Sequence, residues 1–350
     1  MTRHAALLYD DLGDLLTRLA GTGWSADPVV LACDGAHEPA ISALLADRVV
    51  LRTPRPDIHS RPAAALAGYR RHASRFGGGA TVIAEPDPGE TEVAWARAAR
   101  CEAAANLDPA DRFDVVCAYP ATAPEPLLRH VIATHPLLLG PGGARPNPGH
   151  AEPGTVLDQL DLGMPVPLPA DLPVLHAGSS TIADLRGLRE LATAHLAGVP
   201  TLVRTDFVAA LNEILTNAYL HGAPTVELTM WVGAETVEAR VTDHGRGRPD
   251  AAAGYRARPG AGRAGAGLWL ARQACDDIDM WREDGTFTVR AATGIASDRD
   301  RQISGAMARA ETAHTRAALA AHRTRTRPPV PLPAERASRL ARPPAPPPPA

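Results

Sequence analysis

Three polar residues recur at intervals of four in the second half of the chain: Glu213, Asn217 and His221. On a helix, this spacing places their side chains on one face, about 6 Å apart. Carboxylate and carboxamide oxygens suit Mg²⁺, and a carboxylate can also accept a proton from a nucleophile. The spacing is compatible with a metal-assisted site, but Glu-x-x-x-Asn by itself is more often a solvated stripe on a helix surface.

The neighbouring residues predict the helix that carries this polar face. Gly222 follows His221, and glycine commonly ends a helix. Apolar side chains fill the remaining circumference, which is typical of a helix packed against a sheet. These apolar positions are Leu211, Ile214, Leu215, Ala218 and Leu220.

A predicted hairpin follows this helix. Residues 225–232 and 236–242 alternate apolar with polar side chains on either side of a Gly-Ala-Glu turn. The second strand runs into Asp243, with Gly245 and Gly247 behind it. A carboxylate there can accept a hydrogen bond from an amine, and the glycines let the backbone approach a flat ligand. A tight turn without a ligand is the alternative.

Residues 254–267 are rich in Gly, Ala and Arg and lead into a second predicted helix. Gly265 and Gly267 stand directly before Leu268 at its start. A glycine-rich loop at a helix N-terminus offers free N–H groups and the positive end of the helix dipole to a phosphate. Low sequence complexity is the alternative interpretation.

The order of these motifs resembles the GHKL ATP-binding fold of gyrases, heat-shock chaperones, histidine kinases and mismatch-repair proteins, over roughly residues 184–293. The resemblance implies an α/β sandwich with an antiparallel (Bergerat) sheet, with ATP and Mg²⁺ as cofactors. Residues 276–282 and 286–291 match its closing hairpin, and residues 260–264 its lid over the phosphates. The matching motif positions are Glu213 and Asn217 (N box), Asp243, Gly245 and Gly247 (first glycine box), and Gly265, Gly267 and Leu268 (second glycine box).

The resemblance also implies a role for individual side chains. Asn217 would ligate Mg²⁺, and Asp243, assisted by Thr286, would take the adenine amine. Glu213 would draw the proton from an attacking hydroxyl. His221 is explained as well by packing beneath the hairpin as by a contact to phosphate.

Composition and charge limit the other function classes. The chain has 350 residues, 45% of them hydrophobic, and a formal net charge of −3, which allows two domains and argues against direct nucleic-acid binding. It contains no lysine, which excludes a P-loop lysine. No apolar run could span a bilayer and no leader is evident, so we expect a cytoplasmic protein without a membrane partner. The cysteines form no Cys-x-x-Cys pair, so their spacing indicates neither a zinc site nor a disulfide framework: Cys33, Cys101, Cys117 and Cys275.

Residues 1–140 alternate short apolar runs with helical patterns, which predicts a mostly parallel α/β domain. Four stretches in this region resemble the MEDS domain, a sensory module of methanogen and methylotroph regulators related to the RecA/KaiC architecture. The resemblance implies a sensor for an undefined small-molecule or protein signal. No catalytic set is evident, and four polar residues are each explained as parts of a core: His4, Glu102, Cys117 and His135. The predicted strands are 29–33, 49–52, 81–85 and 115–119, the helices 11–19, 41–45, 62–75 and 92–106, and the MEDS-like stretches 4–9, 100–106, 116–120 and 134–136.

Pro and Gly recur through residues 141–178, which predicts a linker between a sensory domain at 1–140 and an ATPase domain at 179–295. A helix over 182–191 opens the second domain. Residues 296–350 form an Ala/Arg-rich stretch and then a Pro-rich tail that we expect to be disordered.

Within the GHKL fold, a sensor histidine kinase carries its phosphoacceptor on a two-helix hairpin before the N box. Neither His195 nor His37 stands in such a context. The compact form is similar to anti-sigma-factor serine kinases, which phosphorylate Ser or Thr on an antagonist protein and bind a sigma factor. The resemblance thus implies a sensor-regulated serine/threonine kinase with an antagonist or sigma factor as partner. A histidine-kinase-like ATPase, a non-catalytic nucleotide switch and a homodimer stay open.

Overall fold

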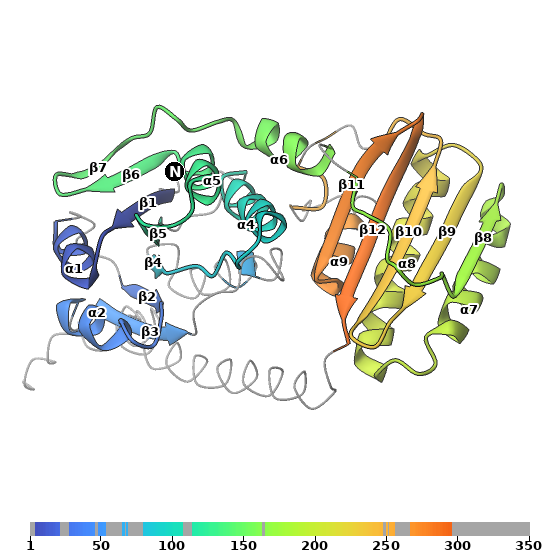
Figure 1. Cartoon of the computed structure of the whole chain (residues 1–350), viewed down its shortest axis with the longest axis horizontal. Coiled ribbons are helices and arrows are strands. Elements are labelled where there is room, and N and C mark those ends of the chain that lie inside the picture. The colour runs from blue at the N-terminus through green and yellow to red at the C-terminus, as the bar shows by residue number, and fades with distance from the viewer. Residues whose placement is uncertain are drawn as a thin grey trace, which may run out of the picture. The chain divides into compact units, whose positions relative to one another are not determined.

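The computed structural model describes residues 4–21, 28–45, 48–53, 65–66, 68, 80–107, 114–162, 165–247, 250, 252–255 and 267–295. These residues belong to one unit, residues 1–298, and are organised by two β-sheets (Figure 1). Among them, no helix combines the length and the apolar character needed to cross a membrane. The predicted lid and the predicted C-terminal tail lie outside the described residues.

The front sheet is built from β1 (His4–Tyr9), β2 (Val29–Ala32), β3 (Val49–Thr53), β4 (Thr81–Ala84), β5 (Asp114–Pro120), β6 (Leu137–Gly140) and β7 (Gly143–Pro146). Its strand order is β3-β2-β4-β5-β1-β6-β7. All neighbours pair in parallel except β6 and β7, which form an antiparallel hairpin. The predicted mostly parallel α/β architecture is confirmed.

Helices cover both faces of this sheet: α1 (Leu12–Ala20), α2 (Glu38–Leu45), α4 (Glu92–Ala105) and α5 (Glu125–Thr134). The alternation along β5 shows this directly. Val116 and Ala118 join the core formed with α1 and α2, whereas Val115, Cys117 and Tyr119 join the core formed with α4 and α5. A strand buried on both faces has a continuous apolar run of residues, which is why the sequence indicated it so clearly.

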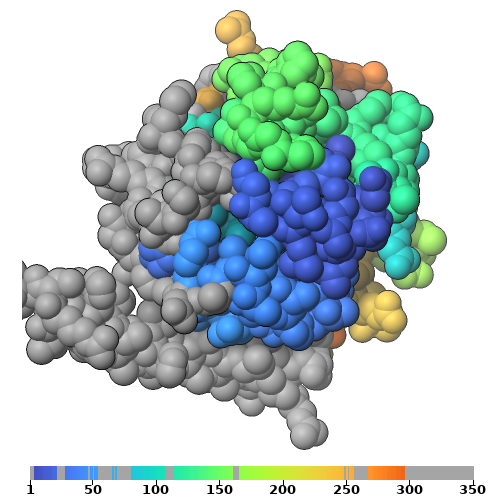
Figure 2. All heavy atoms as spheres, turned by 90° about the vertical axis from the view of Figure 1, so that its left-hand side faces the viewer, coloured from blue at the N-terminus to red at the C-terminus, as the bar shows by residue number. Residues whose placement is uncertain are grey.

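The stretch that composition predicted as a linker contains regular structure. Gly143 has φ +95°, a conformation that glycine adopts readily, and it turns the chain into β7. Pro153 opens the helix α6 (Pro153–Leu162), a position that proline tolerates well. The Asn147 side chain donates to Ile132 O and His135 O, both at 2.7 Å. In Figure 2 this green segment lies against the blue N-terminal residues, so part of the predicted linker packs on the front domain.

The second sheet is antiparallel and consists of β8 (Leu175–Ser179), β9 (Val226–Val232), β10 (Thr236–Asp243), β11 (Asp277–Glu283) and β12 (Thr286–Gly294). Its strand order is β11-β12-β10-β9-β8. One face is covered by α7 (Leu185–His195), α8 (Thr201–His221) and α9 (Gly267–Ala274), with a 3₁₀ turn η2 (Ile182–Asp184) before α7 (Figure 1). The predicted hairpins and the predicted α/β sandwich with an antiparallel sheet are confirmed.

Candidate functional site

Helix α8 carries the polar stripe that the sequence predicted. Glu213 and Asn217 are half-buried, and His221, the last residue of the helix, is exposed. The opposite side of α8 packs into the sheet core, so the helix is fixed while its stripe stays accessible. The buried residues of α8 are Val203, Phe207, Ala210, Leu211, Ile214, Leu215 and Ala218.

The Glu213 carboxylate lies at the N-terminus of α9. A Cβ atom built on Gly267, the first residue of α9, would lie 2.5 Å from Glu213 Oε2. Only glycine permits this approach without a shift, and the helix N-terminus favours a negative charge there. On its other side, Asn212 Nδ2 donates to Glu213 Oε1 at 3.3 Å, and Arg189 Nη1 donates to Asn212 Oδ1 at 2.7 Å.

Sequence reasoning missed Asn212 and Arg189 as positioning residues. Asn212 stands next to Glu213 in the sequence, and that adjacency was the only available signal. Arg189 reaches it from α7, a contact that requires the packing of α7 on α8.

Asp243 ends β10 and is buried, with 4% of its surface exposed. Its Oδ1 accepts a hydrogen bond from the Gly245 N–H at 2.6 Å. A Cβ atom on Gly245 would lie 2.6 Å from Gly222 Cα, so two glycines bring the loop after β10 against the end of α8. The His244 N–H donates to Ala223 O at 3.1 Å and holds the same junction.

The remaining residues of the first glycine box are held from β11 and β12. Gly247 has φ +76°, and a Cβ atom there would lie 2.6 Å from the Phe287 ring. Arg282, which sequence reasoning did not single out, donates to Gly245 O at 2.6 Å and to Arg246 O at 3.1 Å. The Arg282 side chain and the close contact of Gly247 with Phe287 therefore hold the loop after β10 against the sheet.

Thr286 lies at the start of β12, where its hydroxyl donates to Glu283 O at 2.7 Å across the turn. In the register of the sheet, Asp243 pairs with Phe287. The described contact of Thr286 is thus with the turn, and its assistance to Asp243 stays a prediction.

The second glycine box is described in part. Gly265 and the lid at 260–264 lie outside the described residues. Leu268 is half-buried beside Gly254, where an added Cβ atom would lie 2.7 Å from Leu268 Cγ. The next turn of α9 is fixed by Arg272, whose guanidinium lies 4.0 Å from the centre of the Tyr255 ring. Leu268 and Arg272 therefore pack α9 against residues 254 and 255.

The sheet face opposite the helices carries a chain of buried charges. Arg290 donates to Glu238 and to Asp279, both at 2.7 Å. Arg240 donates to Glu238 at 2.8 Å, and Arg100 of α4 donates to Asp279 at 2.8 Å. Burial raises the pKa of Asp279, but Arg100 and Arg290 outweigh that effect and hold the pKa below its ordinary value. Asp279 is therefore ionised at neutral pH.

Residues 178–293 match the family model described as "Histidine kinase-like ATPase domain". This part of the chain is thus a GHKL-type domain, which implies ATP binding. A solved structure that matches is "The crystal structure of the RsbU and RsbW domains of Rv1364c from Mycobacterium tuberculosis", with 23% identity over 36% of this chain and 32% of that chain and a TM-score of 0.27. The chain therefore spans about a third of the solved protein. No curated protein matches this chain.

Proposed function

We propose that residues 178–293 bind ATP with Mg²⁺ and that the chain phosphorylates a serine or threonine of a protein partner. The observation that carries this proposal is the Glu213 carboxylate beside Gly267, at the N-terminus of α9. Free N–H groups at a helix N-terminus bind phosphate, and a carboxylate next to them can accept a proton from a hydroxyl. Asn217, one turn further along α8, completes the polar stripe.

The residues at the end of β10 fit an adenine. Asp243 Oδ1 is already bonded to the Gly245 N–H, which leaves Oδ2 as an acceptor for an amine. Gly222 and Gly245 place no Cβ between α8 and this carboxylate. The Asp243 carboxylate therefore lies directly against the end of α8.

Bound MgATP would supply the phosphoryl group that is transferred. Asn217 would hold the Mg²⁺ ion through its carboxamide oxygen, and the start of α9 would hold the phosphates. Glu213 would accept the proton of the partner's hydroxyl at its carboxylate, which Asn212 and Arg189 keep in place. Phosphoryl transfer depends mostly on such alignment and charge neutralisation.

The proposed partner is an antagonist protein of a sigma factor, or the sigma factor itself, in the cytoplasm. The support is the compact form of the ATPase domain and the absence of a phosphoacceptor context around His195, an exposed residue at the end of α7. The front domain would act as a MEDS-like sensor that regulates this activity.

Nucleotide binding is tested by titrating MgATP into the full chain in a calorimeter. We expect binding by the wild type and by Glu227→Gln, an exposed carboxylate of β9, and a loss of about tenfold or more in affinity for Asp243→Asn. No heat with the wild type would refute the proposal.

Transfer is tested with radiolabelled ATP and candidate antagonist and response-regulator proteins. Label on Ser or Thr supports the proposal. Binding without transfer would instead indicate a nucleotide-dependent switch, and label on His or Asp a histidine-kinase-like activity. Glu213→Ala should bind MgATP but transfer about 10²–10⁴-fold more slowly, as expected for loss of a general base. Unchanged transfer would disprove that role of Glu213.

A further inference from the structure

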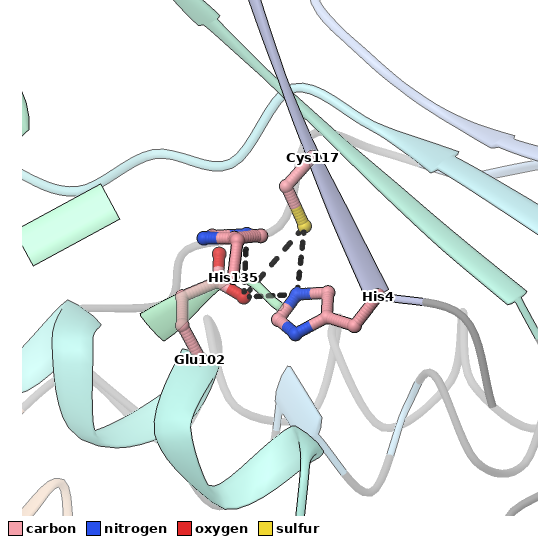
Figure 3. Close-up of side chains that lie close together, drawn as sticks. All are labelled: His4, Glu102, Cys117 and His135. Carbon is pink, nitrogen blue, oxygen red and sulfur yellow. Dashed lines mark hydrogen bonds and ion pairs between the residues drawn. The ribbon is translucent and has the colours of Figure 1, made fainter. Parts of the chain in front are cut away.

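Four side chains that could bind a metal converge inside the front domain. His4 begins β1, Glu102 lies on α4, Cys117 on β5, and His135 caps α5. All four are buried, with 0–3% of their surface exposed. One ligand atom from each lies within 4.8 Å of the others, and Figure 3 shows the side chains pointing toward one another.

Three of the separations match those of a tetrahedral site, the His4–Glu102 pair is shorter, and every pair lies within 4.8 Å. His4 Nε2 lies 2.9 Å from Glu102 Oε2 and 3.5 Å from Cys117 Sγ. Glu102 Oε2 lies 3.6 Å from both Cys117 Sγ and His135 Nε2. Zinc bonds of about 2.0–2.3 Å at tetrahedral angles place neighbouring ligand atoms about 3.3–3.8 Å apart. Only small movements would therefore close the four atoms around an ion.

Neighbouring residues fix which nitrogen of His4 faces the cluster. Asn106 Nδ2 donates to Glu102 O and Thr134 O, so Asn106 Oδ1 can only accept. It lies 3.0 Å from His4 Nδ1, which must therefore be the protonated nitrogen. In the neutral ring, the lone pair of His4 Nε2 then points at the Glu102 carboxylate.

His135 is oriented in the same way. Its Nδ1 lies 2.8 Å from Val131 O, a carbonyl that can only accept, so Nδ1 carries the proton. His135 Nε2 is buried, has no hydrogen-bond partner among the described residues and points at the Glu102 carboxylate. A ring N–H bonded to a carbonyl is the usual support for a metal-ligating histidine.

The cluster thus holds more acceptors than protons. Two imidazole nitrogens and Glu102 Oε2 meet a single possible donor among the described residues, the Cys117 thiol, since the Tyr119 hydroxyl is used by Glu102 Oε1 at 2.6 Å. Buried acceptors facing one another without a donor are costly. Either an additional proton on His4 or a cation must offset their repulsion. A dication together with a thiolate and a carboxylate leaves the buried site neutral.

We propose that His4, Glu102, Cys117 and His135 bind one Zn²⁺ ion in a closed tetrahedral site. Two histidines, one thiolate and one carboxylate are all common zinc ligands, and four protein ligands leave no position for a catalytic water. The ion would therefore join β1, α4, β5 and the end of α5 rather than catalyse a reaction. The proposed metal site shares no residue with the proposed nucleotide site.

The test measures metal in the full chain, without a tag and purified without chelators. We expect about one zinc per chain by mass spectrometry of the metal, and less than about a tenth of that in Cys117→Ala and His135→Ala. Cys33→Ala is the matched control, because Cys33 is also a buried free cysteine but lies outside the cluster, and it should keep its zinc. Circular dichroism verifies that each variant is folded.

Cobalt gives a reading that does not depend on the variants. Co²⁺ added to the metal-free wild type should produce the thiolate-to-cobalt absorption and the intense visible bands of a tetrahedral site. A wild type that binds neither ion, or a Cys117→Ala variant that keeps both metal and spectrum, would overturn the proposal. If the wild type binds neither ion, an additional proton on His4 must offset the repulsion between the buried acceptors instead.

Discussion

Gly245→Ala and Gly187→Ala are the same chemical change, and the structure predicts opposite effects on stability. Gly245 stands between the end of β10 and the end of α8, where an added Cβ atom would lie 2.6 Å from Gly222 Cα and 2.7 Å from Asp243 Oδ1. Gly187 lies on the exposed side of α7, and an added Cβ atom there meets no atom of the described residues within 4 Å.

The magnitudes follow from these distances. Carbon atoms are in optimal contact at about 3.5–4.0 Å, so the Gly222 backbone must move about 1 Å to accept a methyl group on the residue that replaces Gly245. Forcing an extra methyl group into a packed position costs about 1–3 kcal/mol of unfolding free energy. Gly187→Ala should instead add about 0.5–1 kcal/mol, because glycine is unfavourable inside a helix.

Urea unfolding followed by tryptophan fluorescence measures both variants, and calorimetry then measures MgATP binding by each. Because the movement separates Asp243 from α8, Gly245→Ala should also weaken MgATP binding by about tenfold or more, while Gly187→Ala leaves it unchanged. If Gly245→Ala is as stable as the wild type, the close packing of the two glycines is wrong. If it is destabilised but binds MgATP normally, that packing does not shape the nucleotide site.

Two further predictions concern the buried charges. Asp279→Asn should lower the unfolding free energy by about 3–5 kcal/mol, because Arg100 and Arg290 lose a buried charged partner. Glu190 forms an exposed pair with Arg186, so Glu190→Gln should change the unfolding free energy by at most about 1 kcal/mol. Urea unfolding measures both variants. Because folding lowers the pKa of Asp279, the stabilisation by its carboxylate is present above the ordinary pKa of 3.8 and is lost as the pH falls below that value. The difference in unfolding free energy between the wild type and Asp279→Asn should therefore shrink below about pH 4. A difference that stays constant with pH would contradict this prediction.

The elements with local patterns could be predicted from the sequence. The β9–β10 hairpin was predicted because alternation and a short turn are local signals, and α8 because its apolar positions repeat at helical spacing. The helix α6 and strand β7 were missed because proline and glycine were taken as signs of a linker, although Pro153 stands at a helix start and Gly143 at a hairpin turn.

The metal-binding cluster could not be predicted in the same way. Sequence rules for zinc sites rely on pairs of ligands separated by a few residues, and no such cysteine pair exists here. His4 and Cys117 are 113 positions apart and become neighbours only because β1 pairs with β5. The register places His4 opposite Val115, two residues before Cys117, and no local pattern encodes that pairing.

Helix α4 links the proposed metal site to the second sheet, because it carries both a proposed metal ligand and a contact to β11. Glu102 faces the cluster, and Arg100, two residues earlier, donates to Asp279 of β11. A metal ion can influence the ATPase domain by this route only if α4 takes different positions in the metal-bound and metal-free forms. Linkage then requires the effect to be reciprocal, so that nucleotide binding changes the affinity for the metal by the same factor. Two ion pairs join α4 to β11 and would carry such a signal: Arg100–Asp279 and Arg97–Asp277.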